Sequence, residues 1–303
     1  MIPALLRKFD AGREWGTVMK RNISVVGGDL RQLTVYEDFL KDKHTVNIFG
    51  FDKSDRGFKE QELDKISESQ IVILPMPVST DRQNINAVFS SKPIKISDIL
   101  EFLSPAQLVF GGGFDMNFKS ELKKRGIAYF DYLAREELAI KNAVPTVEGA
   151  ISIAINETPI TIDKSRCLVL GYGRIGKILA DRLRSLGADV TVCARKYKDL
   201  AYANSFSYKA TNFSNLKNIL PYQDIVFNTV PSLILDYDAL KVLGDDTLII
   251  DLASRPGGVD FDAAKRLGTK VIWALSLPGK TAPVTSGKII KDTIVNILNE
   301  LEV

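Results

Sequence analysis

Residues 166–187 read RCLVLGYGRIGKILADRLRSLG, and the fold of this half of the chain follows from them. An apolar run is followed directly by a GxGxxG loop and then by an amphipathic helical pattern. Strand, glycine turn and helix in this order are the context that dinucleotide binding requires. The first glycine permits the tight turn, the second lets backbone approach a pyrophosphate, and the third allows close helix–strand packing. We therefore predict a cofactor loop of Gly171, Tyr172, Gly173, Arg174, Ile175 and Gly176.

The end of the next expected strand, residues 189–195, decides between the two nicotinamide cofactors. NAD-binding domains usually carry an acidic residue there, which holds the ribose 2′-hydroxyl. This chain instead has Arg195 and Lys196, and no acidic residue follows before Asp199. Because a guanidinium can hold a 2′-phosphate through paired hydrogen bonds, we predict NADP rather than NAD. In the alternative interpretation, both cations are merely solvated.

Two later apolar runs end in polar residues at the same edge of the predicted sheet. Residues 228–231 (NTVP) follow one of these runs, and residues 253–258 (ASRPGG) follow the other. Ligands of open α/β sheets bind at the carboxyl ends of the strands. We therefore expect these segments near the ribose and nicotinamide. The candidate residues are Thr229, Val230, Pro231 and Ser254.

Both halves of the chain alternate short apolar runs with helical patterns. Residues 22–44 read as strand, glycine turn and helix, and the same plan begins again at residue 166. Such alternation predicts an α/β protein of two doubly wound parallel-sheet, Rossmann-like domains with a cleft between them. The further expected strands lie in residues 45–51, 71–78, 107–112, 127–131, 189–195, 224–231, 247–254 and 270–276.

A connecting helix is expected between the two halves, and Pro145 can start it. Residues 289–302 have apolar residues at helical spacing, so a closing helix should pack back on the first domain. Residues 1–20 differ in character from the rest of the chain; an extension and a genuine N-terminal helix are both open. We predict an N-terminal extension over residues 1–20, a substrate-binding domain over residues 21–143 closed by the helix 287–303, and an NADP-binding domain over residues 144–286.

Composition and charge narrow the class of protein. The 303 residues are 45% hydrophobic and carry a net charge of +3, with both signs mixed along the chain. That profile is typical of a soluble globular protein and predicts no nucleic-acid surface. No apolar run approaches the roughly 18 residues of a membrane span. Without a signal peptide, the expected location is the cytoplasm. Cys167 and Cys193 lie in strand-like runs and are expected to be reduced core residues.

The chain contains a single histidine, His44, in a polar stretch that predicts a surface position rather than a catalytic one. Hydrolysis by a Ser-His-Asp triad is excluded, and no metal site is predicted. The two-domain 2-hydroxy-acid dehydrogenases share the expected architecture but use a histidine late in the chain. This sequence has none there, which argues against that class of enzyme. Proton transfer is left here to Lys, Asp, Glu, Tyr or the substrate itself.

A second group of strand-end residues lies in the N-terminal half. The turn at residues 27–32 (GGDLRQ) lacks the third glycine of a dinucleotide fingerprint. Arg31 in the first helical turn could still bind a carboxylate together with the helix N-terminus. Ser79 with Thr80, and the glycines at 111–113, occupy equivalent strand ends. We predict a small anion pocket, or, in the alternative, only turn glycines and helix caps.

Six motifs in a fixed order resemble the family of dipicolinate synthase A subunits from spore-forming bacteria. The resemblance runs from about Asn22 to the C-terminus and leaves residues 1–20 outside it. The motifs are GGDLRQ (27–32), PTVEGAI (145–151), LGYGRIGK (170–177), NTVPSLIL (228–235), DLASRPGGVDF (251–261) and LPGKTAPVTSG (277–287).

The resemblance implies that the protein makes pyridine-2,6-dicarboxylate in the mother cell during sporulation. The implied precursor is a dihydro- or hydroxytetrahydro-dipicolinate, and the implied activity is that of an NADP-dependent oxidoreductase. A flavoprotein-like B subunit of dipicolinate synthase is also implied as a partner, with homo- and hetero-oligomers. Two alternatives stay open. The chain could be a dehydratase or substrate-presenting subunit for the flavoprotein, or a non-catalytic nucleotide sensor.

A flat dicarboxylate needs two anion sites beside the nicotinamide. One would comprise Arg31 with Ser79, Thr80 and Gly112, and Arg255 or Lys280 would supply the other. Glu148 is a candidate base or, equally, a structural hinge residue. Arg255 could instead pair with an aspartate of its own loop. The candidates for that pairing are Asp260 and Asp262.

Overall fold

The computed structural model describes residues 20–59 and 61–302, which fold into two compact units. The first unit extends to Ala139 and resumes at Ala282, and the second comprises Ile140–Thr281. Of the extension expected over residues 1–20, all but Lys20 lies outside the described residues.

The first unit contains a five-stranded parallel sheet in the order β2-β1-β3-β4-β5. This is the doubly wound order in which ligands bind where the chain changes direction, at the carboxyl ends of β1 and β3. The strands are β1 (Asn22–Val26), β2 (Thr45–Phe49), β3 (Ile71–Ile73), β4 (Leu108–Gly111) and β5 (Ala128–Asp131). The helices are α1 (Leu30–Lys41), η2 (Leu63–Glu68), α2 (Ile96–Phe102), α3 (Met116–Lys124), η3 (Tyr132–Ala134) and α11 (Pro283–Glu300).

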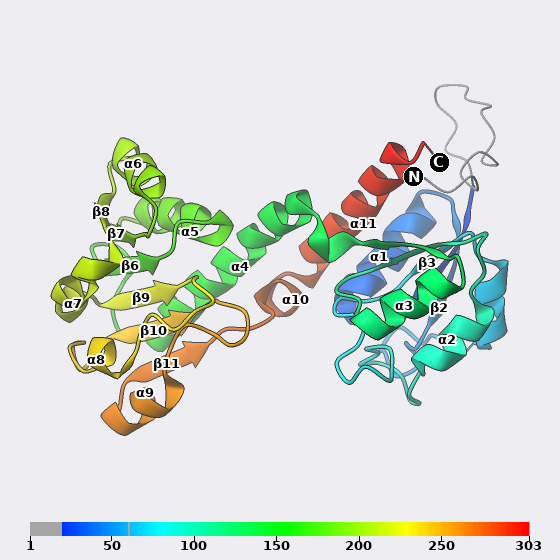
Figure 1. Ribbon diagram of the computed structural model, residues 1–303, viewed down its shortest axis with the longest axis horizontal. Helices are drawn as coiled ribbons and strands as arrows, with labels where there is room; N and C mark the ends of the chain where they lie inside the picture. Colours follow the sequence, from blue (N-terminus) through cyan, green and yellow to red (C-terminus); the bar gives the residue numbers. More distant parts are fainter. Residues whose placement is uncertain (1–19, 60, 303) are drawn as a thin grey trace. The chain divides into compact units, whose positions relative to one another are not determined.

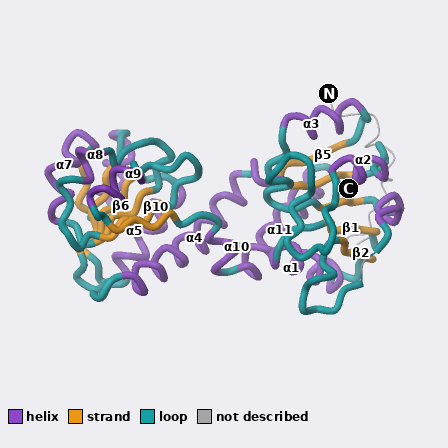
Figure 2. Tube along the Cα trace, turned by 90° about the horizontal axis from the view of Figure 1, so that it is seen from below, coloured by secondary structure: helices purple, strands orange, loops and turns teal. Residues whose placement is uncertain are grey.

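Alternating side chains of these strands form two cores, one on each face of the sheet. Ile23 and Val25 face α1 and α11, whereas Val26 and Val72 face α2 and α3. The closing helix α11 lies along α1 (Figures 1 and 2). Their approach is close, because a Cβ added at Gly287 would lie 2.5 Å from the Arg31 carbonyl oxygen. The C-terminal helix therefore completes the first unit.

The second unit contains a six-stranded parallel sheet in the order β11-β10-β9-β6-β7-β8. Its switch point lies between β6 and β9, where a Rossmann domain binds the dinucleotide. The strands are β6 (Arg166–Leu170), β7 (Asp189–Cys193), β8 (Lys209–Thr211), β9 (Ile225–Asn228), β10 (Leu248–Asp251) and β11 (Lys270–Trp273). The helices are α4 (Glu136–Glu157, which begins in the first unit), α5 (Arg174–Ser185), α6 (Tyr197–Ser205), η4 (Phe213–Asn215), α7 (Leu216–Ile219), η5 (Leu220–Tyr222), α8 (Tyr237–Leu240), α9 (Phe261–Leu267) and α10 (Leu277–Thr281).

Helices cover both faces of this sheet as well (Figure 2). Cys167 and Val169 pack toward α4 and α5, and Leu168 and Leu170 pack toward α8 and α9. The prediction of two parallel-sheet α/β domains is confirmed.

Both cysteines are free and buried, as predicted. Burial raises the pKa of the Cys167 thiol to about 11 and that of Cys193 to about 12. His44, expected at the surface, is instead half-buried. Its Nδ1 accepts the backbone N–H of Arg21, and desolvation lowers the pKa of the imidazole.

The connecting helix differs from its prediction. Pro145 does not start α4 but lies inside it, nine residues after its beginning at Glu136. A proline there removes one backbone donor, and tertiary packing keeps the helix continuous. Leu138, before the proline, is fully buried in the core of the first unit, and Val147, after it, is fully buried in that of the second. Among the described residues α4 is also the one helix long and apolar enough to cross a membrane, but its apolar stripe forms part of a core.

Candidate functional site

The glycine loop lies between β6 and α5 at the switch point of the second sheet. Gly171 has a φ of +93°, a conformation that glycine adopts at little cost. Its N–H donates to the Cys193 carbonyl, which ties the loop to the end of β7. Gly173 is the N-cap of α5, and no side chain among the described residues caps this helix. The N-terminus of α5 therefore presents its first N–H groups and partial positive charge to an anion.

The other two glycines have the roles that a pyrophosphate site requires. A Cβ added at Gly176 would lie 2.1 Å from the Gly171 carbonyl oxygen, so helix and strand meet closely there. At Gly173, in contrast, no described atom lies within 4 Å of an added Cβ. Open space thus remains over the backbone at the helix N-terminus. These two observations fit a dinucleotide pyrophosphate.

The remaining loop residues contribute differently from one another. The Tyr172 ring turns into the core, where it makes an edge contact with Tyr208. Its side chain therefore cannot cover a cofactor, and its backbone alone can contribute. Arg174 is exposed in the first turn of α5, and Ile175 is half-buried against the core.

The end of β7 presents two exposed cations, Arg195 and Lys196. Within the part of the chain that the structure describes, neither side chain makes an ion pair. Ala194, directly before them, is held to β8 by a backbone hydrogen bond to Thr211. This bond holds the backbone directly before Arg195, while both cationic groups stay accessible to solvent.

Two loops follow β9 and β10 at the same edge of the sheet. Thr229 donates both its N–H and its hydroxyl to the Leu170 carbonyl, directly before the glycine loop. Val230 is half-buried, and Pro231 is exposed. Residues 253–258, called the Arg255 loop below, carry exposed Ser254. Hydrogen bonding thus joins the predicted ribose and nicotinamide residues of the first loop to the glycine loop.

Arg255 is exposed, and its guanidinium carbon lies 5.7 Å from the centre of the Trp273 ring. The alternative pairing with Asp260 or Asp262 is not found: Asp260 instead caps α9 by accepting the Ala263 N–H. Within the described chain no ion pair involves Arg255. A cation supported on an aromatic face is thus left open to an anionic ligand.

The two remaining candidates of the second unit are Lys280 and Glu148. Lys280 is exposed on α10. Glu148 lines a groove of about 390 Å³ between the outer face of α4 and the end of α5. As far as the chain is described, that groove is lined by the two helix segments alone, and no residue of the glycine loop contributes to it. The other lining residues are Ile151, Ser152, Ile155, Asn156, Arg182, Ser185 and Leu186.

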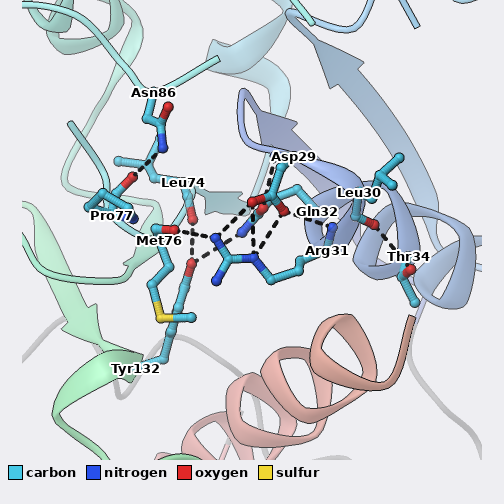
Figure 3. Close-up of polar contacts among 10 residues, drawn as sticks. All are labelled: Asp29, Leu30, Arg31, Gln32, Thr34, Leu74, Met76, Pro77, Asn86 and Tyr132. Carbon is cyan, nitrogen blue, oxygen red and sulfur yellow. Dashed lines mark hydrogen bonds and ion pairs between the residues drawn. The ribbon is translucent and has the colours of Figure 1, made fainter. Parts of the chain in front are cut away.

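In the first unit, the predicted anion site already contains a carboxylate of the chain itself. Figure 3 shows the Arg31 guanidinium against Asp29, with Nε–Oδ1 and Nη2–Oδ2 distances of 2.9 and 2.8 Å. Its Nη2 also donates to the Met76 carbonyl at 2.6 Å. Asp29 caps α1 as well, through the Arg31 N–H, and forms a capping box with Gln32. The expected opening at this helix N-terminus is therefore closed, and Arg31 ties α1 to the end of β3.

The rest of the predicted pocket is also occupied by internal contacts. Gly112 is buried, its N–H donates to the Pro75 carbonyl, and its own carbonyl accepts the Val78 N–H. Both backbone groups of Gly112 are therefore already hydrogen-bonded within the first unit, and a contact of this residue with substrate stays a prediction. Ser79 donates to Asp81 in a turn, and Thr80 is exposed.

Replacing Asp29 with alanine should destabilise the first unit by about 2–4 kcal/mol, because a helix cap is lost and a nearly buried guanidinium loses its partner. Urea unfolding measures this effect. Asp29→Asn is the control, since asparagine caps a helix equally well but carries no charge. An Asp29→Ala protein as stable as the unmodified chain would contradict this description of Arg31.

Sequence reasoning missed three residues of the second unit. Asn228 and Asp251 are the last residues of β9 and β10, and both are fully buried. Their side chains hydrogen-bond at 2.8 Å. Trp273, at the end of β11, donates its indole N–H to the Ala253 carbonyl. The sequence did contain a signal for the first two: the apolar run of β9 ends in an amide residue, and that of β10 ends in a carboxylate residue.

Comparisons with known proteins agree with this geometry. Residues 22–133 match the family model of the N-terminal domain of the dipicolinate synthase A subunit. Residues 146–267 match that of the D-isomer specific 2-hydroxyacid dehydrogenase, NAD binding domain. The second match indicates a dehydrogenase-type domain that binds a nicotinamide dinucleotide.

Relatives cover nearly the whole chain. The dipicolinate synthase A subunit of Bacillus subtilis (strain 168) is 35% identical over 289 residues, which cover 92% of this chain and 96% of that protein. The crystal structure of the same subunit from Bacillus subtilis superposes with a TM-score of 0.85 at 32% identity, covering 94% and 98%. That of the A subunit from Bacillus halodurans gives 0.84 at 30% identity, covering 92% and 97%.

Proposed function

This chain belongs to the family of dipicolinate synthase A subunits, and from that premise we propose that it is the NADP-dependent oxidoreductase subunit of a dipicolinate synthase. Its product would be dipicolinate, formed from a dihydro- or hydroxytetrahydro-dipicolinate precursor during sporulation. The observation that carries this proposal is the glycine loop at the uncapped N-terminus of α5, with exposed Arg195 beside it at the end of β7.

The proposed division of labour follows the positions of the side chains in the second unit. The backbone at Gly173 and the first turn of α5 hold the pyrophosphate, and Arg195 with Lys196 holds the 2′-phosphate. The two loops after β9 and β10 would hold the ribose and nicotinamide. Arg255 binds a carboxylate of the substrate, and Lys280 is a second cation available for it. The residues along the two loops are Thr229, Val230, Pro231 and Ser254.

When bound, NADP would accept the hydride that leaves a ring carbon of the precursor. Aromatisation of the dihydro precursor is strongly favourable: one hydride would pass to NADP, and the chain would assist only the loss of one proton. A hydroxytetrahydro precursor would first have to lose water. Glu148 lies in the groove between α4 and the end of α5, apart from the glycine loop. We therefore do not assign a proton transfer to Glu148 and interpret it as a structural hinge residue. Arg31 is assigned to the support of the β3 end rather than to substrate.

Membership of this family also indicates that the chain has a partner subunit. The relatives from Bacillus subtilis are each named as one subunit or chain of a synthase. We propose that this chain works in the cytoplasm with a flavoprotein-like B subunit, in a hetero-oligomer.

Arg195→Ala tests the cofactor choice. Loss of charge-assisted hydrogen bonds to a 2′-phosphate should cost about 1.5–3 kcal/mol, or roughly 10- to 150-fold in NADP affinity. Affinity for NAD should stay within about twofold, because NAD lacks that phosphate. Fluorescence titration with both cofactors measures the difference, and Lys196→Ala shows whether the second cation shares this task. Equal losses for NAD and NADP would refute the assignment of Arg195.

A further inference from the structure

Two neighbouring strands of the second sheet end in a buried polar pair. Asn228 ends β9 and Asp251 ends β10, and the two residues are directly paired in the parallel ladder. Both have a relative exposure of 0%. A carboxylate is rarely buried so completely unless every oxygen has a partner. The partners of Asp251 therefore indicate what the pair does.

Both oxygens of the Asp251 carboxylate accept hydrogen bonds. Oδ1 accepts from Asn228 Nδ2 at 2.8 Å and from the Ala253 N–H at 3.0 Å. Oδ2 accepts from the Gly258 N–H at 2.9 Å. Ala253 and Gly258 are the two ends of the Arg255 loop. One buried carboxylate thus holds both ends of the loop that carries Arg255.

Asn228 extends the same network to the cofactor side. Its Nδ2 also donates to the Val230 carbonyl at 3.0 Å, and its Oδ1 accepts the Val230 N–H at 3.1 Å. Thr229, between them in sequence, donates twice to Leu170 at the start of the glycine loop. Hydrogen bonds, together with the backbone of residues 228–230, therefore connect the glycine loop through Asn228 and Asp251 to the Arg255 loop.

The Arg255 loop is also packed against this pair. A Cβ added at Gly258 would lie 2.2 Å from Asn228 Nδ2 and 2.6 Å from the Val230 carbonyl oxygen. At the other end of the loop, the Trp273 indole donates to the Ala253 carbonyl at 3.0 Å. The same ring lies under the Arg255 guanidinium. The loop thus has little room to shift unless this network changes.

An apolar pair could fill the same space without the cost of desolvating a carboxylate. A fully satisfied polar pair adds direction, because each donor faces one particular acceptor. We propose that Asn228 and Asp251 are positioning residues that hold the Arg255 loop in register with the cofactor loop. This inference rests on the proposed function, since it takes Arg255 as a substrate-binding residue.

The experiment uses the full chain carrying Trp15→Phe, so that Trp273 is the only tryptophan. In this background Asp251→Asn keeps the shape of the side chain but places an amide N–H₂ opposite a donor. Asn228→Ala is the second variant, in case the first fails to fold. Asp260→Asn is the matched control, because Asp260 follows the same loop but does not contact Asn228 or Asp251.

Asp251→Asn should lower kcat/KM for the precursor about 30- to 100-fold, since small displacements of a binding group cost this much. NADP affinity should stay within about threefold, because the glycine loop and the Thr229 bonds remain. The Trp273 emission should shift without any ligand present. Asp260→Asn should leave all three quantities nearly unchanged.

A double-mutant cycle with Arg255→Ala separates positioning from general stability. If Asp251 acts through Arg255, Asp251→Asn should cost less than about threefold when Arg255 is already alanine. If the effects of the two substitutions on kcat/KM multiply, or if the Trp273 emission does not shift, the inference is overturned. If Arg255→Ala alone has no effect on turnover, the proposed function of Arg255 fails. The Trp273 emission alone then decides whether the pair holds the loop.

Discussion

Replacing Gly173 with alanine should lower NADP affinity roughly 30- to 150-fold, equivalent to about 2–3 kcal/mol, and leave the stability of the free protein almost unchanged. No described atom lies within 4 Å of an added Cβ, and the φ of −83° suits any L-residue. The new methyl group therefore disturbs nothing in the free chain. It projects instead into the space where the backbone should meet the pyrophosphate.

Gly176→Ala is the informative partner of that variant. Its Cβ would lie 2.1 Å from the Gly171 carbonyl oxygen, and backbone rather than a flexible side chain would have to move. We expect a stability loss of about 3 kcal/mol, seen as a lower urea midpoint, with weakened NADP binding as a consequence. If Gly173→Ala binds NADP normally, the open face of the loop is not the pyrophosphate site.

Arg255→Ala should reduce kcat/KM for the precursor roughly 10²- to 10³-fold, because the lost interaction is charge-assisted and orients the reacting ring. NADP affinity and thermal stability should change little. The side chain is exposed and, within the described chain, its recorded contact is the Trp273 ring. Steady-state kinetics with enzymatically generated precursor measures the loss.

Arg255→Lys separates charge from shape in the same assay. Lysine keeps the charge but not the planar fork that matches a carboxylate, so we expect an intermediate rate. Lys280→Ala shows whether the second exposed cation of this unit shares the task. Full activity of Arg255→Ala would remove Arg255 from the substrate site and leave the cofactor assignment intact.

The cofactor loop was predictable because its determinants are local. The positions of Gly171, Gly173 and Gly176 depend on spacing within one strand–turn–helix unit. The exposed position of Arg195 at the end of β7 was predictable for the same reason, whereas its role toward NADP stays a proposal. The parallel α/β architecture of both units also follows from alternating apolar and helical segments, without knowledge of any particular contact.

Residues that act through distant contacts were not predictable in the same way. Asn228 and Asp251 lie 23 positions apart, and the motifs that they begin do not show that the two side chains meet. The sequence also did not show that the backbone groups of Gly112 bond to the segment after β3. For Glu148, helical spacing could not show that the side chain lies in the groove by the end of α5.

Arg31 is an instructive exception, because its partner is local. Asp29 stands two residues earlier at the N-cap of α1, the position where a carboxylate is most favourable. A cation in the first turn of a helix with an acidic N-cap has an intramolecular partner within reach. This pairing was visible in the sequence GGDLRQ and argues against a free anion site there.

The most direct test of the central claim is the balance between NADPH and dipicolinate. The purified chain, without the proposed flavoprotein-like partner and under anaerobic conditions, is given enzymatically generated precursor and NADP, and both products are followed by absorbance. The account predicts one NADPH for each dipicolinate formed, with no flavin present. Dipicolinate formation that is indifferent to NADP, or that requires the flavoprotein and yields no NADPH, would contradict it.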